Sequence, residues 1–350
     1  MEFDLIEMIR QRTAQPRDDV RLGIGDDAAV LAVPPGQELA VALDTLVEGV
    51  HFPRGSAAAD IGWKALAVNL SDLAAMGATP AWALLALTLP APDADFVQGF
   101  ATGFAELAQP HRLALVGGDT TRGPLSISVV VHGLVPPGRA LTRAGARAGD
   151  AVLVTGTLGD SAAGLALLLA DTTHPAPRLR IESGAGSERR EAESKDRHAP
   201  AATDQLRPAR DYLIARLNRP TPRLAAGLAL RERASACIDI SDGLLADLGH
   251  LCAASGVGAE IDAAALPLSS ALLALHVAAG ALPFALGGGD DYELCFSVPA
   301  ARVAEVQAEL ARLGCGATRI GRIVAGAGVR VRGADGAWLT IAQQGWEHFA

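Results

Sequence analysis

The chain has 350 residues, half of them hydrophobic, and a formal net charge of −9 at pH 7. A chain of this size can bury a substantial core and form two domains. Its acidic balance argues against a nucleic-acid partner, because phosphate backbones are bound mainly by clustered Lys and Arg. The chain starts with acidic residues and its apolar stretches are too short to span a bilayer, so we expect neither a targeting segment nor a membrane partner.

The first part of the chain is expected to mix strands and helices. Short apolar runs predict strands at Leu39 to Leu43, Trp82 to Leu89, Leu113 to Val116 and Ser126 to Leu134. Two helices lie among these strands. The better marked one runs from Asp60 to Met76, because it opens on an aspartate of the type that caps helices and is followed by Gly77 and Pro80.

The helix from Asp60 to Met76 carries Asn69 and Asp72 on one face. A carboxylate on a mostly apolar helix is costly to bury unless it is paired or bound to a metal ion. The ordinary explanation for Asp72 is an ion pair with Lys64, and the functional explanation is a metal ligand. The helix taken alone leaves both open.

A second pattern of strands and helices starts after Pro136, Pro137 and Gly138, so we place a domain boundary near residue 140. The predicted domains are residues 1–140 and 141–350. In the second domain, strands and helices alternate at Asp150 to Thr155, Ser161 to Ala170, Ala236 to Ile240, Leu244 to Ala254, Tyr292 to Val298 and Val303 to Leu313. The stretch 171–208 is polar, charged and proline-bearing, which predicts a disordered insertion.

The four cysteines are widely separated and form no Cys-x-x-Cys pair; they are Cys237, Cys252, Cys295 and Cys315. Isolated cysteines near hydrophobic residues are typical of buried free thiols. They fit the reducing cytoplasm, which is the predicted location of the protein.

Aspartates recur where short strand-like runs stop. They lie in Gly25-Asp26-Asp27, Leu43-Asp44, Gly118-Asp119, Ile238-Asp239 and Gly289-Asp290-Asp291. Oxygen-rich clusters favour magnesium, manganese or calcium over zinc, which prefers histidine and thiolate ligands. Two carboxylates about 4 Å apart repel each other by roughly 4 kcal/mol at an effective dielectric constant near 20, and divalent cations would offset that repulsion.

Glycine-rich turns are the other recurring feature. Gly156 to Ser161 and Gly287 to Asp291 have the composition of phosphate cradles, but neither has the Gly-Lys-Ser/Thr ending of a Walker A loop. For Gly159-Asp160-Ser161 a helix-capping turn is the more common explanation. Ser241-Asp242-Gly243, which also precedes a predicted helix, has the same two explanations.

Longer motifs add to this reading. In the first half they are Gly23 to Ala29, Asp44 to Phe52, Ala65 to Gly77 and Gly117 to Thr121. In the second half they are Leu141 to Arg143, Thr155 to Ser161, Ile238 to Leu244, Gly287 to Leu294 and Gly345 to Phe349. In content and order they closely resemble thiamine-monophosphate kinases, a family within the superfamily of aminoimidazole-ribonucleotide synthetases and selenophosphate synthetases. The resemblance covers nearly the whole chain.

The resemblance implies a set of site residues. Magnesium ligands would be Asp27, Leu43 through its backbone carbonyl, Asp44, Asp72, Asp119, Asp239 and Asp242. Nucleotide contacts would come from Gly118, Asp119, Arg143 and Ser241, and substrate contacts from His51, Asp290 and Trp346. Carboxylates can hold the ions that bridge ATP oxygens, a guanidinium can make a forked contact to phosphate, and an indole can stack on a thiazolium or pyrimidine ring.

Each of the less acidic positions has an ordinary explanation as well. His51 fits a partly buried histidine, Arg143 a surface residue and Trp346 C-terminal packing. The chain also departs from the family at two positions. Ala42-Leu43 stands where relatives usually have hydroxyl residues, and Asp290 stands where relatives often have Glu, which would shift the substrate by about one methylene.

The implied reaction transfers the γ-phosphoryl group of ATP onto the phosphate of thiamine monophosphate, with several Mg²⁺ ions. A phosphate nucleophile needs no general base, so no catalytic acid or base is expected, and transfer should be direct and in line, without a phosphoenzyme. The implied fold is α/β (α+β) with two domains. N-terminal strands of two copies would form a barrel in a homodimer, which hides sheet edges, and the C-terminal domain would be α/β.

Other members of the superfamily are alternatives. Selenophosphate synthetase is disfavoured because no cysteine precedes Cys237, and the hydrogenase-maturation relative because the terminus at Ala350 has no cysteine. An enzyme like aminoimidazole-ribonucleotide synthetase remains the alternative enzyme. A non-catalytic magnesium- or nucleotide-binding module is the alternative from another class, with Leu43 as its main sequence hint.

Overall fold

The computed structural model describes residues 2–171, 206–341 and 345. Most of the predicted insertion at 171–208 lies outside the described residues, and so does Trp346. The N-terminal half contains α1 (Glu2–Arg12), β1 (Val20–Leu22), β2 (Val30–Leu31), β3 (Glu38–Val47), α2 (Ala58–Ala75), β4 (Thr79–Leu89), α3 (Ala94–Ala108), β5 (Ala114–Arg122) and β6 (Ser126–Val135).

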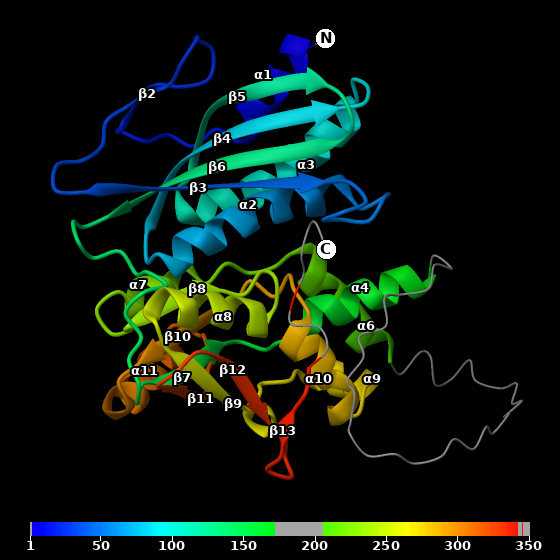
Figure 1. Cartoon of the computed structure of the whole chain (residues 1–350). Coiled ribbons are helices and arrows are strands. Elements are labelled where there is room, and N and C mark those ends of the chain that lie inside the picture. The colour runs from blue at the N-terminus through cyan, green and yellow to red at the C-terminus, as the bar shows by residue number, and fades with distance from the viewer. Residues whose placement is uncertain (1, 172–205, 342–344, 346–350) are drawn as a thin grey trace, which may run out of the picture.

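A four-stranded sheet in the order β3-β6-β4-β5 forms the N-terminal half, with α2 and α3 against one face (Figure 1). Only β4 and β5 run parallel. All four predicted strands are present, but β3 and β5 extend beyond their apolar runs. Asp44 and Asp119 therefore lie within strands rather than after them. Backbone hydrogen bonds to the neighbouring strands extend β3 and β5 past these two aspartates. The apolar runs alone do not predict this extension.

Helix α2 confirms the predicted helix but begins at Ala58, and its N-cap, Ala57, makes no side-chain cap bond. The predicted capping role for the first aspartate was therefore wrong. Asp60 lies inside the first turn, where it accepts a hydrogen bond of 2.5 Å from Arg219. An acid in the first turn is also favoured by the helix dipole. Asp60 therefore does mark the start of α2, but from within the first turn rather than from the N-cap position.

Strands and helices of the C-terminal half are β7 (Ala151–Thr155), α4 (Asp160–Asp171), α6 (Arg207–Asn218), α7 (Leu224–Leu230), β8 (Ala236–Asp239), α8 (Leu244–Ser255), β9 (Gly258–Asp262), α9 (Ser270–Leu275), α10 (Ala278–Gly287), β10 (Leu294–Val298), α11 (Val303–Arg312), β11 (Ala317–Val324), β12 (Gly328–Arg332) and β13 (Trp338–Leu339). The predicted strand from Tyr292 begins only at Leu294. Asp290 and Tyr292 have positive φ, which breaks the extended backbone that a ladder needs.

A seven-stranded sheet in the order β13-β12-β9-β11-β7-β10-β8 is the centre of the C-terminal half. One hydrophobic cluster lies under α8, and a second joins the opposite face of the sheet to α7, α11 and the N-terminal helices. Helix α2 contacts α7 and β8 and lies between the two sheets (Figure 1). The core thus continues from one half into the other through α2.

The predicted free thiols are confirmed, since all four cysteines are buried and none is in a disulfide. Burial raises the pKa of the Cys252 thiol to about 11, and it also raises the pKa of Cys237, Cys295 and Cys315. None of the described helices is long and apolar enough to cross a membrane.

Candidate functional site

Helix α2 carries polar side chains across the junction between the two halves. The buried Ser71 hydroxyl donates to Asp239 Oδ2 at 2.7 Å, and Lys64 Nζ donates to Asp290 Oδ2 at 3.1 Å. Residues separated by 168 and 226 positions in the chain are joined by these two bonds. The candidate site therefore lies where α2 meets the end of β8 and the loop before β10.

Asp44 on β3, Asp72 on α2, Asp239 on β8 and Asp242 just after β8 act on one another electrostatically. Burial, followed by repulsion from Asp239 and Asp44, raises the pKa of Asp72 to about 8. Burial, followed by repulsion from Asp239 and Asp242, raises the pKa of Asp44 to about 6. Burial also raises the pKa of Asp239, against the hydrogen bond from Ser71. We call these four carboxylates the acidic cluster.

The chemistry of the acidic cluster fits a hard divalent cation. Its donors are all carboxylate oxygens, and their mutual repulsion is relieved by positive charge. Among the described residues, no three His, Cys, Asp or Glu side chains are placed to hold an ion by themselves. Ions at this site would therefore take part of their coordination from substrate phosphates or water, as magnesium usually does in phosphate sites.

Asp27 and Asp119 lie on other segments of the N-terminal half than Asp44 and Asp72. Asp27 is exposed in the turn between β1 and β2. Asp119 lies on β5, in a row of paired residues that leads through Ala86 and Ser128 to Thr45 on β3. Three strand spacings separate β5 from β3, or about 14 Å. The structure therefore does not bring Asp119 next to Asp44.

The backbone of β3 is tied to α2 by Asn69. The Asp44 N–H donates to Asn69 Oδ1 at 3.0 Å, and the Asn69 amide donates to the Ala65 carbonyl at 2.9 Å. Asn69 is fully buried, so these bonds satisfy a polar group that would otherwise be costly. The result is a fixed position for Asp44 relative to Asp72.

The turn Ser241-Asp242-Gly243 presents three successive backbone N–H groups to one carboxylate oxygen. Asp247 Oδ2 accepts from all three, at 3.1, 3.1 and 3.0 Å. Burial and repulsion from Asp239 and Asp242 raise the pKa of Asp247 to about 7. The Asp247 carboxylate on α8 therefore holds this turn in place, and with it Asp242 of the acidic cluster.

Asp290 is held at both carboxylate oxygens. Lys64 Nζ contacts Oδ2, and the Tyr292 hydroxyl donates to Oδ1 at 2.9 Å. The same ammonium donates to the His51 carbonyl at 3.2 Å, which brings two predicted substrate residues together. The His51 ring accepts the Val47 N–H at its Nδ1 atom, 3.0 Å away. The ion pair proposed above between Lys64 and Asp72 is wrong, because Lys64 reaches across to Asp290.

Arg143 is exposed in the loop after β6, as its ordinary explanation predicts. Its charge nevertheless lowers the pKa of Asp72 and of Asp239, so it lies within electrostatic range of the acidic cluster. Gly118 lies on β5, where a Cβ atom would clash with the Leu85 carbonyl. Only glycine allows β5 this close approach to β4.

The turn Gly156 to Ser161 leads into α4, which begins at Asp160. Its Gly159 N–H donates to the buried Asp291 Oδ2 at 2.8 Å. A carboxylate of the chain thus occupies a backbone donor that a phosphate cradle would need. Glu293, also buried, accepts from Thr155 at 2.7 Å and pairs with Arg216 at 2.9 Å.

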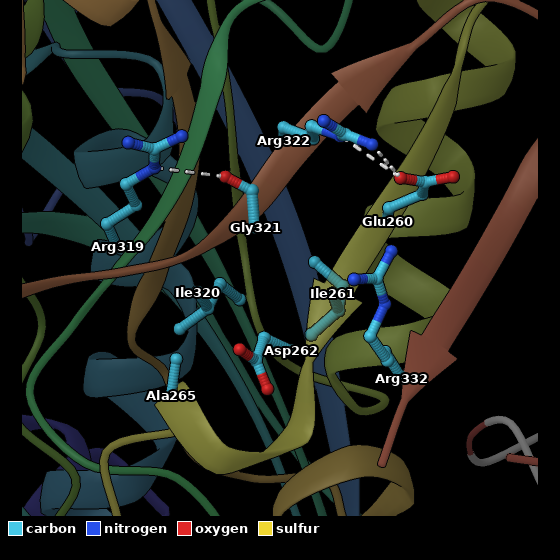
Figure 2. Close-up of a pocket in the computed structure, with 9 residues that line it drawn as sticks. All are labelled: Glu260, Ile261, Asp262, Ala265, Arg319, Ile320, Gly321, Arg322 and Arg332. Carbon is cyan, nitrogen blue, oxygen red and sulfur yellow. Dashed lines mark hydrogen bonds and ion pairs between the residues drawn. The ribbon is translucent and has the colours of Figure 1, made fainter. Parts of the chain in front are cut away.

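A cavity of about 280 Å³ lies on β9, β11 and β12, lined by Arg319, Arg322, Arg332 and Glu260 among others (Figure 2). Figure 2 shows Arg322 directed at Glu260, which also pairs with Arg330 on the next strand. None of the predicted site residues lines this cavity. Paired charges of this kind are typical of a solvated sheet face, so the acidic cluster is the candidate site.

The chain matches the family models AIR synthase related protein, N-terminal domain, over residues 25–135, and AIR synthase related protein, C-terminal domain, over residues 147–334. It is 47% identical over 349 residues to the thiamine-monophosphate kinase of Escherichia coli (strain K12), which covers 100% of this chain and 98% of that protein. The chain belongs to the thiamine-monophosphate kinase family.

Two solved structures agree with the membership in this kinase family. The thiamine-monophosphate kinase from Stenotrophomonas maltophilia K279a is 48% identical, with a TM-score of 0.81 over 96% of each chain. AaThiL complexed with AMPPCP and TMP is 34% identical, with a TM-score of 0.72 over 99% of this chain and 97% of that one. The two-domain fold expected from the kinase resemblance is confirmed.

Leu43, one departure from the kinase pattern, has its side chain on the sheet face opposite α2. Its side chain is 60% exposed, next to Val41 on the same face of β3. The side chain therefore points away from the acidic cluster, whereas Asp44 points toward it. The expectation that Leu43 contributes a backbone carbonyl is left as a prediction.

Four residues near the kinase site were not assigned these positions from the sequence: Lys64, Ser71, Tyr292 and Asp247. Ser71 lies inside the motif from Ala65 to Gly77, so its position was a usable signal. Asp247 lies one helical turn after Gly243, where an acid at a helix start is a capping signal. The partner of Lys64 could not be read from the chain order.

Proposed function

We propose that the chain catalyses the transfer of the γ-phosphoryl group of ATP to the phosphate of thiamine monophosphate, giving thiamine diphosphate and ADP. The observation that carries this proposal is the acidic cluster, which gathers carboxylates from both halves of a chain in the thiamine-monophosphate kinase family. AaThiL, a relative, is solved in complex with AMPPCP and TMP. ATP and thiamine monophosphate are therefore the proposed substrates.

Several Mg²⁺ ions are proposed, held by Asp44, Asp72, Asp239 and Asp242. Such ions neutralise phosphate oxygens and align the reacting groups. Asp27, Asp119 and the Leu43 carbonyl are proposed as further ligands on the other side of the nucleotide. The repulsion among buried carboxylates supports the assignment, because a cation removes the cost of keeping them ionised.

The remaining residues are proposed to position the two substrates. Gly118, Asp119, Arg143 and Ser241 would contact ATP, and the Arg143 guanidinium suits a phosphate. His51 and Asp290 would contact thiamine monophosphate, together with Trp346, which lies outside the described residues. No general base is proposed, since the acceptor phosphate already carries an anionic oxygen.

A homodimer is proposed as the working assembly. Strand β3 is an edge strand, and its outward face exposes Leu39, Val41 and Leu43 at 43%, 57% and 60%. A long apolar sheet edge left open to water favours pairing with another chain. A second copy placed there would extend the sheet toward the barrel that the family resemblance implies.

The domain limits and the location are also proposals. We place the boundary near residue 140, with domains 1–140 and 141–350, and the family-model limits at 135 and 147 support it. A cytoplasmic location is supported by the four free, buried thiols, which a reducing compartment would preserve.

The proposed activity is tested by mixing the purified chain with ATP, Mg²⁺ and thiamine monophosphate and separating the products by chromatography. Thiamine diphosphate is expected with the complete mixture, and none is expected with a chelator or with free thiamine as acceptor. Absence of thiamine diphosphate while ATP still binds would contradict the proposal. It would favour a synthetase of the superfamily or a non-catalytic binding module.

A further inference from the structure

We propose that Lys64 is a positioning residue for the acceptor substrate, because its ammonium fixes the Asp290 carboxylate from across the domain junction. The inference rests on the proposed function, in which Asp290 contacts thiamine monophosphate. Lys64 belongs to α2 of the N-terminal half, and Asp290 to the loop before β10 of the C-terminal half.

The contacts of Lys64 are specific and shielded from water. The residue is only 3% exposed, and its Nζ atom lies 3.1 Å from Asp290 Oδ2 and 3.2 Å from the His51 carbonyl. An ammonium has three N–H donors. Two have acceptors among the described residues, so one is left to meet an oxygen of the bound substrate.

The backbone around Asp290 shows that its orientation is enforced. Asp290 and Tyr292 have φ values of 67° and 49°, which are rare for residues other than glycine. Their N–H groups donate to the carbonyls of Ser241 and Ile240, both at 2.8 Å. Such strain persists only where surrounding contacts hold it, and it is concentrated at functional sites. Lys64 and Tyr292, one at each oxygen, are those contacts for the Asp290 side chain.

Charge explains why a lysine suits this position. The Asp290 N–H donates to the carbonyl of Ser241 at 2.8 Å, and Ser241 directly precedes Asp242, so Asp290 lies beside the acidic cluster. Without Lys64, the Asp290 carboxylate would face those acids with no described cation paired to it. It would then turn toward water or toward the metal ions, and the substrate would lose a fixed partner.

The test compares steady-state kinetics of wild type, Lys64→Met, Asp290→Asn and the double variant. Lys64→Met is expected to raise the KM for thiamine monophosphate about tenfold and to leave the KM for ATP within about twofold. Asp290→Asn should raise the same KM. The double variant should resemble Asp290→Asn within about twofold, because both changes remove one interaction.

Arg219→Met is the matched control. Arg219 also forms an ion pair with α2, through Asp60, whereas Asp290 pairs with Lys64. It should lower thermal stability without changing the KM for thiamine monophosphate. A purely structural role for Lys64 would make the two variants behave alike.

The inference would be overturned if the increases in KM for thiamine monophosphate caused by Lys64→Met and Asp290→Asn multiplied in the double variant. It would also be overturned if Lys64→Met raised the KM for ATP as much as the KM for thiamine monophosphate. If Lys64→Met does not fold, the double variant replaces it, because removing both charges leaves neither partner unpaired. Its KM for thiamine monophosphate is then compared with that of Asp290→Asn. Equal values support the inference, and a higher value in the double variant overturns it. Failure of the wild type to convert thiamine monophosphate would instead overturn the proposed function, and this inference with it.

Discussion

The acidic cluster keeps carboxylates where their ionisation is costly. Asp72 and Asp44 have pKa values raised to about 8 and about 6 from an ordinary value of 3.8, mainly by burial. The folded chain therefore binds more protons than the unfolded chain between pH 3.8 and those values. The contribution of Asp44 and Asp72 to the stability of the metal-free protein is expected to be fully present below the ordinary carboxyl pKa and to be lost as the pH rises through about 6 and about 8.

Asp72→Asn should increase the stability of the metal-free protein at pH 8 and lower phosphoryl transfer at least a hundredfold. The gain should be roughly 2 kcal/mol, since one pKa unit corresponds to about 1.4 kcal/mol and solvent screening reduces the full shift. Urea unfolding at pH 5 and pH 8, with chelator or Mg²⁺, measures it. The gain should be much smaller at pH 5, where the folded Asp72 is protonated, and should disappear with Mg²⁺.

Asp211→Asn is the control for this measurement, because Asp211 is an exposed acid on α6 whose ion-pair partner among the described residues is Arg207. It should change neither stability nor turnover. Equal stability of the metal-free wild type at pH 5 and pH 8 would contradict the reading of the cluster as a repulsive site.

At the scale of elements, α2 and α3 cross at unusually close range. A Cβ atom on Gly103 of α3 would clash with the Ala59 carbonyl of α2, and one on Gly62 would clash with the Phe100 carbonyl. Glycine at these positions lets the helix backbones touch, as small residues do at close helix crossings. The crossing holds α2 against the sheet and so holds Lys64, Ser71 and Asp72 at the junction.

Gly103→Ala should therefore destabilise the chain by about 3 kcal/mol, the upper range for an overpacked core. Gly249→Ala on α8 is the matched control, because a Cβ atom there meets nothing within 4 Å. It should stabilise the chain by about 0.5 kcal/mol through helix propensity. Denaturant unfolding midpoints of the two variants measure these stability changes. Similar midpoints for Gly103→Ala and Gly249→Ala would argue against the close crossing of α2 and α3.

Most elements could be predicted because their signals are local. The apolar runs at Trp82 to Leu89 and Ser126 to Leu134 gave strands, since burial against a helix layer dictates those residues. The partners of Lys64 and Ser71 lie more than 160 residues away and follow only from the packing of two domains. For Asp119, the motif predicted a ligand, but strand order decides that it lies far from Asp44 in one chain.

At the scale of the whole molecule, the open face of β3 determines the expected assembly. Val41→Arg should convert a dimer at micromolar concentration into a monomer, because a charge in the centre of an apolar edge opposes pairing. Size-exclusion chromatography with light scattering measures the mass. Val277→Arg is the control, since Val277 is 79% exposed before α10 and should leave the dimer intact. A monomeric wild type would contradict the proposed assembly.

The buried thiols have a practical consequence for the whole molecule. The thiolate is the reactive form of cysteine, and here all four thiols are buried with raised pKa values. The native chain should leave Ellman's reagent almost unreacted at pH 8, whereas the chain in denaturant should consume four equivalents. Rapid reaction of the native chain would contradict the packing around these residues. The rate of slow labelling would report how often the native fold opens, without any engineered probe.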